Sequence, residues 1–334
     1  MKFGPVDVSE AQGAILAHSV ALAGRARLRK GRVLTPEDLV ALQAAGHSIV
    51  TVAQLADGDV DENAAADVLA RAFVPDPTAQ GLELTAAFTG RVNLLATGPG
   101  VVVLDEAAIE AVNLVDPMIT IATVPNYQQM AQGGMIATIK IISYAVSQEA
   151  LDAACAHARA CIRLARPVAK SVQLIVTEID GGAGDKGWRS VADRIAAFGL
   201  TLAPPVCVAH QVPDLSAALS GQTGDIALIL TGSATSDIED VAPAAVRAAG
   251  GDVARFGMPV DPGNLLFIGE LGAAVVIGLP GCARSPALNG ADWVIARVVC
   301  GLPVTARDIA GMGVGGLLKE IPSRPQPRRG PATV

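Results

Sequence analysis

The chain has 334 residues, enough for two domains, and 51% of them are hydrophobic although only 3% are aromatic, so its cores must consist mainly of Ala, Val, Leu and Ile. The mean hydropathy is +0.44, but no run of about 18 uninterrupted apolar residues occurs, which argues against a membrane span. No apolar run follows Lys2 at the amino terminus, which argues against a secretory signal. The formal net charge of −7 argues against nucleic-acid binding, and the wide spacing of the histidines and cysteines argues against a zinc site. We therefore expect a soluble cytoplasmic protein without membrane or nucleic-acid partners.

Residues 1–166 mix short helices and strands without regular alternation, which predicts a smaller α+β domain. A helix should begin where Thr35 caps it and Pro36 takes its first position, and it should end at Gly46. Further helices are expected over 62–72 and 149–164, and strands over 118–123 and 135–142. Pro167 follows the last of these helices and marks the predicted domain boundary.

Residues 167–304 alternate strands with helices, which predicts an α/β domain with three αβα layers and a mostly parallel sheet. Strands are expected over 172–177, 206–209, 225–231, 265–268 and 274–279, and helices over 188–198, 215–219, 242–250 and 286–299. Ligands bind such sheets beyond the carboxyl ends of the strands, which directs attention to the loops after Thr177, Thr231 and Leu279. Residues 305–334 form a carboxy-terminal extension whose basic, proline-rich end should be disordered without a partner.

The segment Thr231–Pro243 reads TGSATSDIEDVAP and joins an aliphatic strand to a helix. Its small residues are Gly232, Ser233 and Ala234, and its acids are Asp237, Glu239 and Asp240. Small residues let backbone N–H groups approach an anion at a helix start, but three carboxylates would repel a bare phosphate. A Mg²⁺ ion held by Asp240, with Asp237, would resolve this conflict. The alternative is that Asp240 only caps the helix while the other two carboxylates are solvated.

Two further turns flank strands of the same region. Leu279-Pro280-Gly281-Cys282-Ala283-Arg284-Ser285 follows an aliphatic strand, and Asp261-Pro262-Gly263-Asn264 lies between strand-like segments. Either one alone is an ordinary turn. Residues 311–316 formally match the G-x-G-x-x-G dinucleotide fingerprint, but too few residues follow for a βαβ unit, so we expect a turn there as well.

Together, in this order and spacing, these motifs resemble the molybdopterin-binding domain that the MogA, MoeA and gephyrin proteins share, and the whole chain is similar to a MoeA-like branch of that family. The family's adenylyltransferases carry T-G-G-T-G-x-x-x-R-D-V-T-P, and the spacing from Thr231 to Asp240 and Pro243 is the same here. Its molybdenumtransferases carry K-P-G-K-P and L-P-G-N-P-x-S, which align with 261–265 and 279–285.

The resemblance implies that molybdopterin lies on the loop after Thr231 and that the other two loops close the site. The ligand contacts it implies are Thr231, Gly232, Ser233, Ala234, Asp237, Pro262, Gly263, Asn264, Pro280, Gly281, Cys282, Arg284 and Ser285. Asp240 is implied as a catalytic residue and, with Asp237, as a Mg²⁺ ligand. A homo-oligomer is also implied, with a cofactor nucleotidyltransferase or a molybdoenzyme as its partner.

The chain departs from the family pattern at several positions. Ser233 replaces the second glycine, Cys282 replaces an asparagine, and Asp261 and Asn264 replace both lysines of K-P-G-K. Those lysines would neutralise phosphate or molybdate, and Arg284 and Lys186 are the candidate substitutes, with Arg284 the better placed in the sequence. We therefore expect a protein that binds molybdopterin or molybdenum cofactor during biosynthesis, maturation or delivery. The alternatives are an active molybdenumtransferase and a nucleotide pyrophosphatase of the competence-damage-inducible type, whose loop reads T-G-G-L-G-P-T-x-D-D.

Overall fold

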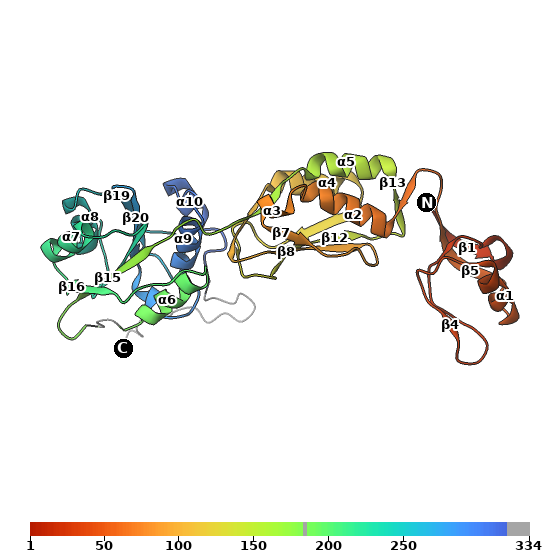
Figure 1. Ribbon diagram of the computed structural model, residues 1–334, viewed down its shortest axis with the longest axis horizontal. Helices are drawn as coiled ribbons and strands as arrows, with labels where there is room; N and C mark the ends of the chain where they lie inside the picture. The colour runs from red at the N-terminus through yellow and green to blue at the C-terminus, as the bar shows by residue number, and fades with distance from the viewer. Residues whose placement is uncertain (183–185, 319–334) are drawn as a thin grey trace, which may run out of the picture. The chain divides into compact units, whose positions relative to one another are not determined.

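The computed structural model describes residues 1–182 and 186–318, so the expectation for the proline-rich tail falls outside the described residues. The chain divides into two compact units (Figure 1). Unit 1 comprises Met1–Gly98 and Val102–Leu164, and unit 2 comprises Pro99–Val101 and Ala165–Val334. Within the described ranges, none of the helices combines the length and the apolar character that crossing a bilayer requires.

The first part of unit 1 is built around an antiparallel sheet with the strand order β1-β5-β2. Its elements are β1 (Lys2–Asp7), the 3-10 helix η1 (Val8–Glu10), β2 (Ile15–Leu16), β3 (Val20–Ala21), β4 (Arg27–Leu28), α1 (Pro36–Ala44) and β5 (Ile49–Gln54). Thr35 and Asp38 form a capping box at the start of α1, so the predicted helix start is confirmed. Leu16, Leu34 and Leu42 are fully buried in the small core that these elements enclose.

The rest of unit 1 packs helices on the antiparallel sheet β10-β12-β8-β7. Its elements are β6 (Asp59–Asp61), α2 (Glu62–Phe73), α3 (Pro77–Gln80), β7 (Leu82–Leu84), β8 (Arg91–Ala96), β9 (Gly100–Leu104), α4 (Glu106–Val115), β10 (Ile119–Thr123), β11 (Gln129–Met130), β12 (Met135–Ile141), β13 (Ala145–Ser147), α5 (Gln148–Ala158) and β14 (Ile162–Ala165). Phe73 of α2 meets Leu94 and Ile139 of the sheet in a second core, separate from the first.

The prediction of one helix over 149–164 is wrong in its last third. The helix α5 ends at Ala158, Ala160 adopts a positive φ of 51°, and the chain continues as the strand β14. Ile162 and Leu164, two residues apart, both point into the core, as expected for a strand. A short apolar run in the sequence fits such a strand and one face of a helix equally well.

Unit 2 contains one six-stranded sheet with the order β16-β15-β17-β20-β19-β18. Its elements are β15 (Val172–Glu178), α6 (Trp188–Ala196), β16 (Val206–Ala209), α7 (Val212–Ser220), β17 (Ile226–Leu230), α8 (Val241–Ala248), β18 (Asp252–Phe256), β19 (Phe267–Leu271), β20 (Ala274–Leu279), the 3-10 helix η2 (Gly281–Arg284), α9 (Gly290–Val299) and α10 (Ala306–Gly311). The first four strands of that order run parallel, whereas β19 runs antiparallel to its two neighbours.

Helices cover both faces of this sheet, with α7 and α8 on one side and α6 and α9 on the other (Figure 1). Ile175, Ile229 and Val276 face the α7 and α8 side, and most of their neighbours in sequence are buried as well, so the central strands are largely aliphatic. The α/β class predicted from the sequence is confirmed. The helix predicted from residue 286 begins only at Gly290, because Asn289 and Asp292 form its capping box.

The cysteines differ in burial and therefore in the expected reactivity of their thiols. Burial raises the pKa of the Cys161 thiol and of the Cys300 thiol to about 11, whereas Cys207 is exposed on β16. A thiol with a pKa near 11 is ionised in about one molecule in a thousand at pH 8, and the thiolate is the reactive form.

We therefore expect a maleimide at pH 8 to label Cys207 first, while Cys161 and Cys300 react only after the chain unfolds. Peptide mass mapping at short labelling times measures the order. The Cys207→Ser variant, which should lose the fast phase, is the control. Early labelling of Cys161 or Cys300 at pH 8 would contradict their burial.

Candidate functional site

Four loops of unit 2 meet at one edge of its sheet. The strands β15, β17 and β20 are parallel neighbours in register, with Ile175 beside Ile229 and Ile229 beside Gly278, so their carboxyl ends coincide. The strand β19 is antiparallel to β20, which brings the β18–β19 connection to the same edge. The three motifs found in the sequence therefore lie on adjacent loops, as the predicted topology requires.

Gly232 brings the β17–α8 loop against the end of β15. Its N–H donates to Thr177 Oγ1 at 3.0 Å, and a Cβ added to it would lie 2.7 Å from the Thr177 carbonyl oxygen. The motif alone predicts that this glycine lets an anion approach the backbone. The structure gives its N–H a protein partner instead, so the close packing of the loop on the strand is what requires glycine here.

His210 is a residue of this edge that the sequence analysis did not select. Its Nδ1 lies 2.7 Å from Thr177 Oγ1, and its backbone N–H donates to the Glu178 carbonyl at 2.9 Å. Thr177 is fully buried, so its hydroxyl links His210 to Gly232 out of contact with solvent. The sequence signal for this contact is a histidine directly after one aliphatic strand and a threonine at the end of another.

Local partners occupy the carboxylates that the sequence analysis proposed for Mg²⁺. Asp240 caps α8, since its Oδ1 accepts from Val241 N at 2.7 Å and its Oδ2 accepts from Ser236 N at 2.9 Å. Asp237 Oδ1 accepts from Glu239 N at 2.8 Å. Among the described residues, no group of three or more His, Cys, Asp or Glu side chains could hold a metal ion. The capping alternative for Asp240 is thus observed, while its binding of Mg²⁺ stays a prediction.

Arg284 links the three loops that follow the parallel strands. Its guanidinium donates to the Thr231 carbonyl at 3.1 Å and to the carbonyl of Lys186, which precedes α6. Gly187, with a φ of 85°, lies so close that an added Cβ would be 2.5 Å from the Arg284 Cβ. The side chain predicted to supply positive charge is therefore engaged in holding the loops together.

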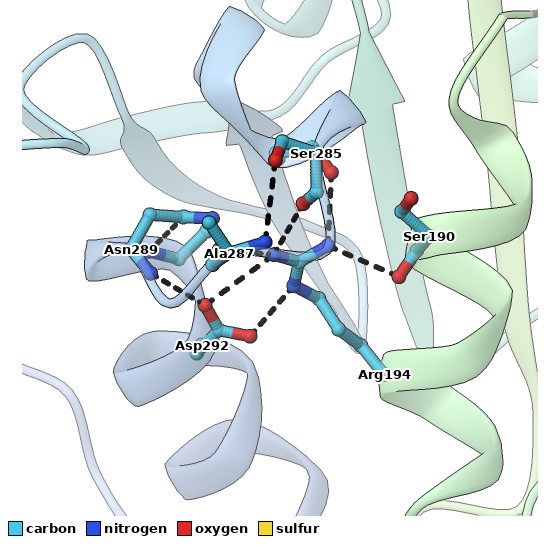
Figure 2. A network of polar contacts seen from close by, with 8 residues as sticks. Ser190, Arg194, Ser285, Ala287, Asn289 and Asp292 are labelled. Carbon is cyan, nitrogen blue, oxygen red and sulfur yellow. Dashed lines mark hydrogen bonds and ion pairs between the residues drawn. The ribbon is translucent and has the colours of Figure 1, made fainter.

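Arg194 of α6 fixes the shape of the β20–α9 loop (Figure 2). Its side chain is only 9% exposed, and its Nε donates to Asp292 Oδ1 at 2.6 Å. The two terminal nitrogens of its guanidinium donate to four backbone carbonyls, those of Ser190, Ala283, Ser285 and Ala287. The fork geometry of arginine makes this multiple contact possible, and no lysine could reproduce it.

The Pro-Gly turn packs against the start of α9. Gly290 N donates to the Pro262 carbonyl at 2.9 Å, and a Cβ on Gly263 would lie 2.8 Å from Gly290 N. The backbone of Asp261 pairs with residues 316–318, and Gly316 approaches the Pro259 carbonyl too closely for a side chain. The G-x-G-x-x-G segment is therefore a turn supporting this loop, as expected.

The remaining predicted contacts differ in exposure. Ser233, Ala234, Asn264, Gly281 and Ser285 are exposed, Cys282 is half-buried, and Pro280 is buried. The exposed members lie on three different loops of the same edge, which leaves a surface of backbone and small side chains that a ligand could reach. Whether a ligand contacts them stays a prediction.

Comparisons with known proteins add little to this geometry. A family model described as "Domain of unknown function (DUF8806)" matches residues 5–54. No curated protein matches the chain. A solved structure, the molybdopterin biosynthesis MoeA protein from Pyrococcus horikosii, aligns over 93% of this chain and 76% of that chain with 12% identity and a TM-score of 0.28. A likeness of this size carries no argument, so the functional case rests on the motifs and their arrangement.

Replacing Gly232 with Ala should destabilise unit 2 by about 1–3 kcal/mol, because the new methyl group would overlap the end of β15. Both tryptophans, Trp188 and Trp293, lie in unit 2, so their fluorescence during urea unfolding reports this unit alone. The matched control is Gly281→Ala, where an added Cβ meets nothing within 4 Å. Equal unfolding midpoints for the two variants would contradict the packing role of Gly232.

Replacing Arg194 with Lys should destabilise unit 2 by about 1–3 kcal/mol, because lysine keeps one charge beside Asp292 but loses most of the hydrogen bonds to the loop carbonyls. The same tryptophan fluorescence measures the loss. The control is Arg189→Lys on the exposed face of α6, which should change stability by less than about 0.5 kcal/mol. A negligible effect at Arg194 would show that the loop does not depend on this guanidinium.

Proposed function

We propose that unit 2 binds molybdopterin, or its molybdenum-loaded or nucleotide form, during the biosynthesis, maturation or delivery of molybdenum cofactor. The observation that carries this proposal is the convergence of three motifs at one sheet edge. Thr231 and Arg284 are joined by a hydrogen bond, and Pro262 and Gly290 by another, although each pair is distant in sequence. A binding site of the kind that the family resemblance implies requires these loops to lie side by side.

The phosphate of the pterin would lie at the exposed tip of the β17–α8 loop. Ser233 and Ala234 present small side chains there, so a ligand can approach the backbone closely. Thr231 and Thr235 are buried beneath this tip and hold it, with their hydroxyl oxygens 3.4 Å apart. Lys186, exposed before α6, is the cation that could approach a ligand from the neighbouring loop.

A carrier or delivery role fits the charges better than molybdenum transfer does. Asp261 and Asn264 stand where the transferases have lysines, and the guanidinium of Arg284 is engaged with the carbonyls of two loops. Little positive charge thus remains for molybdate on the Pro-Gly turn. In this proposal the protein passes the cofactor to a nucleotidyltransferase or a molybdoenzyme.

Placing a negative charge at the loop tip tests the proposed site. Ala234→Asp should weaken molybdopterin binding at least fivefold, since a carboxylate about 4 Å from a phosphate costs roughly 1–4 kcal/mol, depending on the effective dielectric constant. The matched control is Ala273→Asp, an exposed alanine in the β19–β20 turn at the opposite edge of the sheet. Fluorescence titration of the full chain with molybdopterin gives both dissociation constants.

Equal affinities in the two variants would remove the β17–α8 loop from the site. The native chain should show no molybdate-dependent release of AMP from adenylylated molybdopterin. Saturable turnover with molybdate and Mg²⁺ would replace the carrier assignment with the transferase one.

A further inference from the structure

The strongest positive charge of the described chain lies in unit 1, on the segment Val20–Val33, which we call the basic hairpin. Its basic residues are Arg25, Arg27, Arg29, Lys30 and Arg32, and it contains no acidic residue. All five basic residues are exposed. Because the whole chain has a formal net charge of −7, the remainder is more acidic than that value, and the hairpin contrasts with it in sign.

The basic hairpin is held in a defined shape. Its strands β3 and β4 pair through Val20 with Leu28, and Leu28 is buried in the small core of unit 1. His47 Nε2 lies 2.8 Å from the Ala21 carbonyl, and Lys30 N donates to Ser19 Oγ at 3.0 Å. The charges are thus carried by an ordered hairpin whose backbone needs little rearrangement on binding.

Only one of the five charges serves the fold. Arg32 Nε donates to Asp38 Oδ2 at 2.7 Å, which supports the capping box of α1 and, together with the charge of Arg32, lowers the pKa of the Asp38 carboxyl. Within residues 1–182 and 186–318, the side chains of Arg25, Arg27, Arg29 and Lys30 form no ion pair. These four exposed cations are therefore available to an external anion.

We propose that the basic hairpin is a docking surface for an acidic peptide segment of a partner protein. Arginine binds a carboxylate with two parallel hydrogen bonds, and three of the four available cations are arginines. The proposal concerns unit 1 and does not depend on what unit 2 binds.

The charge distribution favours a short acidic segment over a nucleic acid. A duplex is bound mainly through many phosphate contacts spread along its length, and one hairpin with four available cations offers few of them. The hairpin also contains no aromatic residue on which unpaired bases could stack. An acidic peptide of about a dozen residues can contact the hairpin alone, whereas an anionic bilayer, like the duplex, extends far beyond it.

A fluorescent 12-residue peptide of glutamate and glycine, titrated with the full chain, tests the surface by anisotropy. The native chain should bind it, and raising the salt concentration from 50 to 200 mM should weaken binding several-fold. Neutralising the hairpin with Arg25→Gln, Arg27→Gln, Arg29→Gln and Lys30→Gln should reduce affinity at least tenfold. The fold is checked by unchanged far-UV circular dichroism.

The matched control neutralises four exposed cations elsewhere, with Arg159→Gln, Arg163→Gln, Arg307→Gln and Lys2→Gln, and should change affinity by less than twofold. Equal losses in the two quadruple variants would overturn the proposal, because net charge alone would then explain binding. A labelled 12-base-pair duplex and vesicles containing phosphatidylserine are further arms. Tighter hairpin-dependent binding to either of these than to the peptide would also overturn it.

Discussion

The guanidinium of Arg194 donates to four backbone carbonyls and one carboxylate while almost excluded from water, and the shape of the candidate site depends on it. The carbonyls of Ala283 in η2 and of Ser285 and Ala287 in the irregular segment after it all accept from this one guanidinium. Such a hydrogen bond contributes about 0.5–1.5 kcal/mol, and one planar fork supplies several at once. Asp292 balances the charge and also accepts from Asn289 N at 2.8 Å, so the same carboxylate starts α9. The loop, the helix start and α6 are therefore fixed by a single ion pair.

Close packing of backbone on backbone fixes the neighbouring loop in a different way. Gly232 lies against the end of β15 because it has no side chain, and the Thr177 hydroxyl that receives its N–H also contacts His210. Arg284 then joins this loop to the one shaped by Arg194. A substitution at either Thr177 or Arg194 should consequently shift the loop tip, although neither side chain is proposed to contact a ligand. These contacts hold several loops in one arrangement before anything binds.

The sequence predicted the parts of the fold that depend on local chemistry. Thr35 and Pro36 mark the start of α1 because capping involves residues three apart, and the strands of unit 2 were recognised from their aliphatic runs. The site edge could also be predicted, because the carboxyl ends of parallel strands coincide. The contacts of Arg194 could not be, since its partners are backbone carbonyls about ninety residues away that carry no side-chain signature. The sequence alone also leaves open whether Asp240 caps α8, and the structure shows the cap through the N–H groups of Ser236 and Val241, while Mg²⁺ binding by Asp240 stays a prediction.

The charge balance at the site edge constrains the form in which an anionic ligand would arrive. Asp237 and Glu239 are exposed beside the loop tip, and Arg247 pairs with Glu239 at 2.7 Å and so neutralises one of the two. Arg284 donates inward to the loop backbone. A bare phosphate at Ser233 and Ala234 would thus meet one carboxylate with no paired cation in the described loop, at a cost of roughly 1–4 kcal/mol if they approached to about 4 Å. A ligand that brings a divalent cation with it would turn the same carboxylate into an oxygen donor, because Mg²⁺ commonly bridges one protein carboxylate and a substrate phosphate. If unit 2 binds a phosphate at this loop tip as proposed, the exposed carboxylate would favour the metal-complexed form over the free one, without a preformed cluster of three carboxylates.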